Sequence, residues 1–172
     1  MDEPIAIPDG QVTTQPSLIA RMVAALSLSG TERVLEVGTG LGFQTAILAV
    51  LARDVVSVER FADLADRARA NLDAAGLANV TVVVGDGTLG VREQAPYGAV
   101  VVAAASRRIP GPLIHQLVDG GRLVHPVGPG GHDVVTAFHK EGDRLVMDAR
   151  LIPARFVPLV GMQEGGRARP DR

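Results

Sequence analysis

Three groups of acidic residues and glycines each follow a short apolar run of the sequence. The first is the segment Glu36-Val37-Gly38-Thr39-Gly40-Leu41-Gly42, the second is Glu59, and the third is Gly85-Asp86-Gly87. Glycine lets the backbone turn tightly and approach a ligand without a clash from a Cβ atom. A carboxylate beside such a turn can accept hydrogen bonds from a bound nucleoside. Together the three groups predict a binding site for a nucleoside cofactor.

The spacing within the first segment helps to choose the cofactor. Dinucleotide-binding loops follow G-x-G-x-x-G, whereas here the spacing is G-x-G-x-G and Phe43 stands at the third-glycine position. Glu36, two residues before Gly38, would repel a pyrophosphate but would attract a cationic sulfonium group. The pattern therefore favours S-adenosylmethionine, and an NAD-dependent oxidoreductase is the disfavoured alternative.

Glu59 and Asp86 suit the other parts of such a cofactor. Glu59 lies about 20 residues beyond the glycine segment, the offset at which an acid can bind ribose hydroxyls. Asp86, between two glycines, can accept a hydrogen bond from an adenine amino group. Each residue also has an ordinary structural explanation, because Glu59 can pair with Arg60 and Gly-Asp-Gly is common in turns.

Composition excludes several other classes of site. The chain has no cysteine, so disulfides, zinc-thiolate sites and thiol nucleophiles are ruled out. Its net charge is −2 without a concentrated excess of Lys and Arg, so no nucleic-acid partner is expected. The four histidines do not have the spacing of metal ligands on one helix, so no metal is expected.

The length of 172 residues and the 47% hydrophobic content fit one domain with a buried sheet. We expect that domain to span residues 1–162 and residues 163–172 to form a flexible tail, because the tail is rich in charge and glycine. No charged-then-apolar leader is visible and no apolar run approaches the ~20 residues that cross a membrane. We therefore expect a cytoplasmic protein with no membrane partner.

Strand and helix signals alternate along the chain and would position these residues. Strands are predicted over 33–37, 54–58, 79–84, 99–103 and 122–127, helices over 16–28, 42–51 and 61–75, and a closing hairpin over 134–138 and 144–151. This order predicts an α/β fold with a mostly parallel sheet, helices on both faces and a C-terminal antiparallel hairpin. Ligands of such sheets bind beyond the carboxyl ends of the strands, which is where the three acidic groups lie.

The N-terminal residues carry a more specific pattern. Asp2-Glu3-Pro4-Ile5 is followed by Gly10-Gln11-Val12-Thr13-Thr14-Gln15-Pro16, and Arg155-Phe156-Val157-Pro158-Leu159 occurs late in the chain. With the glycine segment and the stretch 109–128, these motifs resemble those of protein-L-isoaspartate O-methyltransferases, in order and over nearly the whole chain. The resemblance implies a Rossmann-like class I methyltransferase fold with S-adenosylmethionine as the cofactor. It also implies methylation of the carboxylate of L-isoaspartyl residues in damaged proteins or peptides, which are the expected partners.

The resemblance assigns roles by position. The cofactor would be held by Glu36, Gly38, Thr39, Gly40, Gly42, Glu59, Arg60, Asp86 and Gly87. The peptide would be bound by Gln11, Thr13, Gln15, Pro16, Arg155, Phe156 and Val157. Thr14 falls on the acceptor-site serine of the family and would be the catalytic residue. A carboxylate is already ionised at neutral pH, so one hydroxyl that orients it would suffice and no catalytic base is needed.

Departures from the family pattern leave other functions open. Thr14 adds a methyl group to the expected serine, and Val12 replaces a threonine. The family usually carries further residues before the Asp-x-Pro segment, and without them we expect weaker cofactor retention or substrate capture. The alternatives are methylation of an ordinary aspartate in a specific peptide to drive imide formation, and a module that binds S-adenosylmethionine without turnover.

Overall fold

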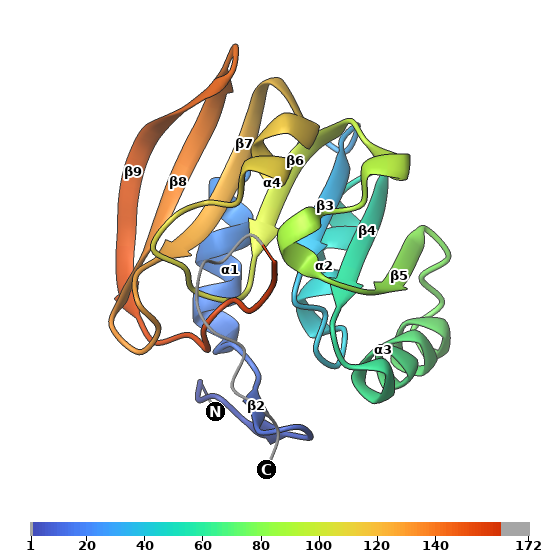
Figure 1. The fold of residues 1–172 in the computed structure, drawn as a ribbon. Coiled ribbons are helices and arrows are strands. Elements are labelled where there is room, and N and C mark those ends of the chain that lie inside the picture. Colours follow the sequence, from blue (N-terminus) through green and yellow to red (C-terminus); the bar gives the residue numbers. More distant parts are fainter. Residues whose placement is uncertain (1, 163–172) are drawn as a thin grey trace.

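The structure is a computed structural model that describes residues 2–162. Its main sheet contains β3 (Arg33–Val37), β4 (Asp54–Glu59), β5 (Val80–Val84), β6 (Tyr97–Val102), β7 (Leu117–Val127), β8 (Asp133–Glu141) and β9 (Arg144–Ala154). The strands lie in the order β5-β4-β3-β6-β7-β8-β9 (Figure 1). Neighbours from β5 to β7 are parallel, and β8 and β9 add an antiparallel hairpin. The predicted mostly parallel sheet with a closing hairpin is confirmed.

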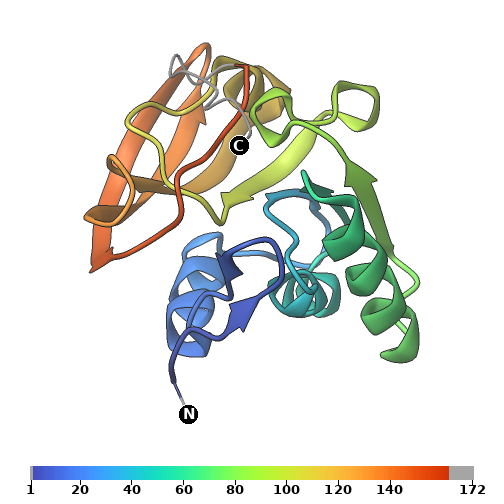
Figure 2. The same cartoon turned by 60° about the horizontal axis from the view of Figure 1, so that its bottom comes forward.

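Helices cover both faces of this sheet. They are α1 (Pro16–Ala25), α2 (Phe43–Leu51), α3 (Ala62–Ala74) and α4 (Gly111–Gln116), with short 3-10 turns η1 (Gly87–Leu89) and η2 (Arg92–Gln94). Figure 2 shows α1, α2 and α3 together on one side of the sheet and α4 on the other. This arrangement confirms the predicted α/β layering.

The alternation of strand side chains divides the core into two layers. On one face, Val34 of β3 packs in a cluster with Met22 of α1 and Leu48 of α2. On the other face, Leu35 packs in a cluster with Leu113 of α4. All of these side chains are buried, so both faces of the central strand are covered by apolar groups.

Two features near the N-terminus were not predicted from the sequence. A small antiparallel pair, β1 (Ala6–Ile7) and β2 (Gln11–Val12), is joined by a turn in which Asp9 and Gly10 have φ of 60° and 66°. Helix α1 also ends at Ala25, three residues earlier than predicted, because Ser27 adopts the left-handed conformation with φ 49°. The pair β1–β2 lies beside the first turn of α1 and forms one wall of the site described below.

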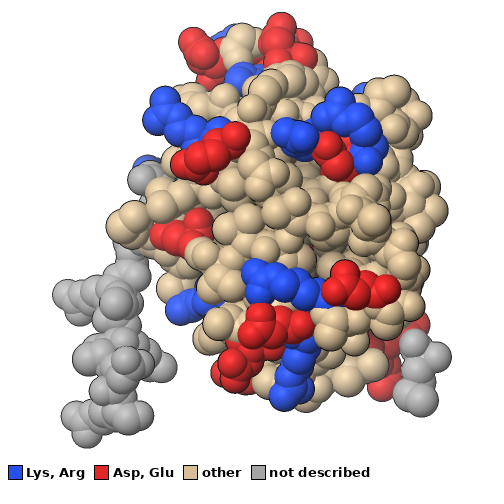
Figure 3. Space-filling view, turned by 90° about the vertical axis from the view of Figure 1, so that its right-hand side faces the viewer, with Lys and Arg blue, Asp and Glu red and all other residues tan. Residues whose placement is uncertain are grey.

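Within residues 2–162, no helix is long and apolar enough to cross a membrane. On the face seen in Figure 3, acidic and basic side chains are interspersed and do not separate by sign. The predicted tail, residues 163–172, lies outside the described residues.

Candidate active site

A cavity of about 380 Å³ opens where β3, β4, β5 and β6 end. The loops that follow these strands line it, and the pair β1–β2 and the segment 157–160 close its other sides. It therefore occupies the position expected for a ligand of a parallel sheet, beside the switch point between β3 and β6.

The glycine segment after β3 forms the floor of this cavity. Gly38, Gly40 and Gly42 have φ of 97°, 55° and 89°, a region that favours glycine strongly over other residues. A Cβ atom on Gly38 would lie 3.3 Å from the Cβ of Ala103, so the backbone there is also closely packed. Gly38, Thr39 and Gly40 line the cavity, while Gly42 caps the start of α2 behind them.

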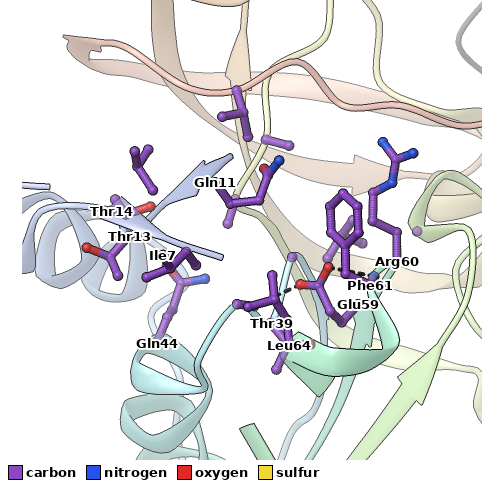
Figure 4. Close-up of a pocket in the computed structure, with 18 of the residues that line it drawn as sticks. Ile7, Gln11, Thr13, Thr14, Thr39, Gln44, Glu59, Arg60, Phe61 and Leu64 are labelled. Carbon is purple, nitrogen blue, oxygen red and sulfur yellow. Dashed lines mark hydrogen bonds between the residues drawn. The ribbon is translucent and has the colours of Figure 1, made fainter. Parts of the chain in front are cut away.

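Glu59, the last residue of β4, faces the cavity and is held firmly. Its Oε2 accepts a hydrogen bond from Gly40 N at 2.9 Å, and its Oε1 accepts one from Phe61 N at 3.1 Å. The side chain is 5% exposed. Each carboxylate oxygen has a second lone pair, so the pair of oxygens can also accept from two neighbouring hydroxyls of a ligand. Figure 4 shows Glu59 beside Phe61 and Arg60, whose guanidinium lies 4.9 Å from the centroid of the Phe61 ring.

Gly87 lines the cavity, but Asp86 lies behind it. Asp86 Oδ1 accepts from Thr88 N at 2.9 Å and Thr88 Oγ1 at 2.6 Å, and Oδ2 accepts from Met162 N at 2.8 Å. Partial burial acts to raise the pKa of this carboxyl, but these hydrogen bonds outweigh it and hold the pKa below its usual value. Asp86 thus joins η1 to the end of the described chain, and its expected contact with an adenine amino group stays a prediction.

Glu36 takes a different position from the one its charge suggested. It is fully buried and does not line the cavity. Its carboxylate accepts hydrogen bonds from Gln44 Nε2 at 3.0 Å, Thr45 Oγ1 at 2.5 Å and Ser57 Oγ at 2.6 Å. Burial raises its pKa to about 7 against the effect of these three bonds, and the charge of Glu59 adds to the rise. Glu36 therefore lies one layer behind the cavity surface, beneath the first turn of α2.

The N-terminal loop brings Thr14 to the opposite end of the cavity. Thr13 fixes the loop because its Oγ1 accepts from Ile5 N at 2.9 Å and its own N–H donates to Ile5 O at 2.8 Å. Asp2 holds the start of α1 by accepting from Ser17 N and Ser17 Oγ at 2.9 and 2.6 Å. Within residues 2–162, the Thr14 hydroxyl makes no hydrogen bond to another residue. It is therefore available to a ligand.

A second cavity of about 240 Å³ meets the first at Thr14. The residues that line both cavities are Val12, Thr13, Thr14, Ala103 and Val157. Gln15, Arg155 and Phe156 line the second cavity only, Gln11 lines the first only, and Pro16 lines neither but begins α1. Most of the residues expected to bind peptide are thus brought together at one junction.

The late segment that contains Arg155 to Leu159 is tied across the carboxyl end of β6. Phe156 N donates to Asp133 Oδ2 at 3.1 Å, Ala105 N donates to Val157 O at 2.8 Å, and Leu159 N donates to Ala105 O at 2.7 Å. Asp133 is buried and also accepts from Gly130 N and Gly131 N. These bonds fix Val157, which separates the two cavities.

Sequence reasoning missed several lining residues, chiefly Gln44, Ile7, Phe61 and Leu64. Gln44 could have been found, because it lies in the first helical turn after the glycine segment, directly above the end of β3. Ile7 could not, because a strand of two residues leaves no periodic pattern.

His125 of β7 lies outside the candidate site. It lines neither cavity, is fully buried, and has a 2.8 Å hydrogen bond between Nε2 and Ser106 Oγ. Burial lowers its pKa to about 4, against the opposing effects of Ser106 and Asp133. The histidine is therefore a packed core residue.

The comparisons with known proteins agree on one family. The family model described as protein-L-isoaspartate(D-aspartate) O-methyltransferase matches residues 1–164. A protein-L-isoaspartate O-methyltransferase of Methanoculleus marisnigri is 52% identical over 161 residues, which cover 93% of this chain and 72% of that protein. One of Koribacter versatilis is 44% identical over 168 residues, which cover 98% of this chain and 75% of that protein.

Solved structures give the same result. A structure titled protein-L-isoaspartate O-methyltransferase superposes with a TM-score of 0.85 at 29% identity, covering 96% of this chain and 54% of that one. A beta-aspartate methyltransferase of Plasmodium falciparum, solved with S-adenosyl-L-homocysteine, shares the fold with a TM-score of 0.79 at 23% identity, covering 93% and 81%. By its sequence and its fold, the chain belongs to the protein-L-isoaspartate O-methyltransferase family.

Proposed function

We propose that this protein transfers the methyl group of S-adenosylmethionine to the carboxylate of L-isoaspartyl residues in damaged proteins or peptides. The observation that carries the proposal is the junction of the two cavities. The larger holds Glu59 at one end and Thr14 at the other, and the smaller is lined by Thr14, Arg155 and Phe156. A nucleoside cofactor and a peptide carboxylate would meet beside the Thr14 hydroxyl.

The larger cavity fits the cofactor. Glu59 offers two fixed carboxylate oxygens to the ribose hydroxyls, and Phe61 and Leu64 offer apolar surface beside them. The glycine segment gives close access to its backbone. We assign cofactor contacts to Gly38, Thr39, Gly40, Glu59, Arg60 and Gly87, with Gly42, Glu36 and Asp86 supporting that surface from behind.

The bound cofactor supplies a methyl group attached to a positively charged sulfur. This sulfur is a good leaving group. The protein has to bring the acceptor carboxylate in line with that methyl group and exclude water. The Thr14 hydroxyl would donate a hydrogen bond to one carboxylate oxygen and leave the other oxygen free to attack the methyl group. Ala103 and Val157 close the junction with apolar surface. Because the carboxylate is already ionised, no residue has to remove a proton.

We assign peptide contacts to Gln11, Thr13, Gln15, Arg155, Phe156 and Val157. The exposed Arg155 would attract acidic groups near the damaged residue, and Phe156 and Val157 would pack against the peptide backbone. A cytoplasmic location stays a prediction.

The direct test is methyl transfer to matched peptides. We expect label from methyl-labelled S-adenosylmethionine to appear in an isoaspartyl peptide as a base-labile ester, and not in the same peptide with ordinary aspartate. Transfer to the aspartyl peptide alone would instead favour a role in imide formation. Binding of S-adenosylhomocysteine without transfer to either peptide would leave only a binding module.

The role of Thr14 is tested by a pair of variants. Thr14→Ala should lower kcat by about 10-fold or more, because one hydrogen bond to a charged group in the transition state is lost. Thr14→Ser keeps the hydroxyl and should retain activity. Affinity for S-adenosylhomocysteine, measured by calorimetry, should change little in both. Equal kcat in all three proteins would remove Thr14 from the chemistry.

A further inference from the structure

Gln44 lines the cofactor cavity and carries a buried acceptor. It lies in the first turn of α2, is 6% exposed, and lines the cavity. Its Nε2 donates to Glu36 Oε1 at 3.0 Å, and Thr45 and Ser57 hold the other oxygen of that carboxylate from behind. The ionised form of Glu36 only accepts, so with this form Nε2 faces Glu36, as observed, and Oε1 faces away. Within the described residues, Gln44 Oε1 is buried and has no hydrogen-bond partner.

A buried carbonyl oxygen without a donor is unfavourable, so such an atom beside a cavity points to a donor on the molecule that fills it. Figure 4 shows where in the cavity this donor would lie. Gln44 lies below Ile7 and Thr13, whereas Glu59 lies with Phe61 on the other side of Thr39. The donor therefore belongs to the end of the ligand that is remote from the ribose.

S-adenosylmethionine has three kinds of hydrogen-bond donor. The ribose hydroxyls face Glu59, and the adenine amino group lies on the far side of the ribose. Only the α-ammonium group of the amino-acid end remains for Gln44. We infer that Gln44 Oε1 accepts a hydrogen bond from this ammonium group, and that Glu36 is the positioning residue that orients the carboxamide. The inference rests on the proposed cofactor and names a contact for its amino-acid end.

Four ligands separate this contact from the rest of the cofactor site. S-adenosylhomocysteine and 5′-(3-aminopropylthio)-5′-deoxyadenosine carry the ammonium group, while 5′-(3-carboxypropylthio)-5′-deoxyadenosine and 5′-methylthioadenosine lack it. Gln44→Met keeps the length of the side chain and removes the acceptor. We expect calorimetry to show affinity for the two ammonium ligands reduced by about 10-fold or more, as for loss of a charge-assisted bond. Affinity for the other two ligands should change less than about 2-fold. Their contacts with the rest of the site are independent of Gln44 and remain.

Thr45→Val is the matched control. It removes another donor to Glu36, but Thr45 is fully buried and does not line the cavity. Its effect should therefore be equal for all four ligands. A uniform loss of affinity for all four ligands in Gln44→Met would overturn the direct contact. If wild-type protein binds none of the four ligands, the proposed function falls and this inference falls with it.

A second measurement needs no variant. The side-chain NH₂ resonances of Gln44 report on the same carboxamide in the wild-type protein. We expect them to shift on addition of the two ammonium ligands and to move little with the carboxypropyl ligand. Identical shifts with all ligands would contradict the inference even if Gln44→Met failed to fold.

Discussion

Glu36 and Glu59 show how one residue type takes two roles beside the same cavity. Both follow the apolar residues of parallel strands, but only Glu59 reaches the surface, where two backbone N–H groups fix its oxygens. Glu36 precedes the last residue of β3 and shares the face of Val34, so it points beneath α2 and meets Gln44 and Thr45 there. Position in the strand, and not charge, decides which carboxylate can touch a ligand.

Removing the charge of Glu59 should therefore reduce cofactor affinity. In Glu59→Gln, the carboxamide keeps one acceptor oxygen, which cannot serve two backbone N–H groups and two ribose hydroxyls together. We expect the dissociation constant of S-adenosylhomocysteine, measured by calorimetry, to rise about 10-fold to 100-fold.

Glu32→Gln is the control for the change of glutamate to glutamine. Glu32 also binds backbone N–H groups, those of Ser29, Gly30 and Thr31, but it does not line the cavity. Its replacement should leave cofactor affinity unchanged. An equal loss in the two variants would mean that Glu59 acts only through the fold.

At the scale of elements, the ends of β3 and β5 fit together through glycines. Gly87 begins η1 and lies against Val37, the last residue of β3, so closely that an added Cβ would overlap Val37 Cγ1. Gly85, two residues earlier, has open space around its Cα. The two glycines of the same Gly-Asp-Gly motif thus have different reasons to be small.

We expect this difference to appear in stability. Gly87→Ala should lower the free energy of unfolding by about 1–3 kcal/mol, as for insertion of a methyl group into a packed contact. Gly85→Ala should change it by less than about 0.5 kcal/mol, as for a surface substitution. Chemical denaturation of both variants checks this. Adding Val37→Ala to Gly87→Ala should recover part of the loss, and equal stabilities of the two single variants would contradict the packing explanation.

The elements that the sequence predicts correctly are those with a long apolar pattern. The run 33–37 is predicted and observed with the same bounds, because it is buried on both faces. Helix α4 and the pair β1–β2 were missed, since six-residue and two-residue elements are too short to show a period. Strand β7 begins at Leu117, earlier than predicted, because pairing with β6 and not its own pattern extends it.

The candidate site also divides into features that the sequence predicts and features that it does not. Gly38, Gly40 and Glu59, which needed a particular backbone shape or strand end, line the cavity, and their contacts with a cofactor stay predictions. The sequence predicts the helix over 42–51 but not that this helix covers the Glu36 side chain. The position of Gln44 after the glycine segment could be predicted, but its bond to Glu36, a contact between two elements, could not. Contacts of that kind follow from the packing of α2 on β3, which no local pattern describes.

At the scale of the whole molecule, two buried ionisable groups in different core layers should give stability opposite pH dependences. Glu36 faces α2, with its pKa raised from 4.5 to about 7 by burial and by Glu59. His125 lies in β7, with its pKa lowered from 6.5 to about 4 by burial, against Ser106 and Asp133. The folded protein therefore keeps a proton on Glu36 that the unfolded chain releases, and lacks one on His125 that the unfolded chain binds.

The sign follows for each group from proton linkage. Glu36 contributes stability that is fully present below pH 4.5 and is lost as the pH rises to about 7. His125 contributes stability that is present above pH 6.5 and is lost as the pH falls to about 4. Each contribution is on the order of 3 kcal/mol. The two windows overlap over most of their width, so the contributions of these two groups should nearly cancel in the wild-type protein.

Single variants should reveal how the stability contributed by each of the two groups depends on pH. In Glu36→Gln only the His125 slope remains, so the free energy of unfolding relative to wild type should increase between pH 5 and pH 7. In His125→Gln, whose carboxamide can still reach Ser106, only the Glu36 slope remains, so the same difference should decrease over that range. Urea denaturation of the three proteins at pH 5, 6 and 7 gives these differences directly, and groups titrating alike in all three drop out of them. Three parallel curves would show that neither group is held in the protonation state that its burial implies.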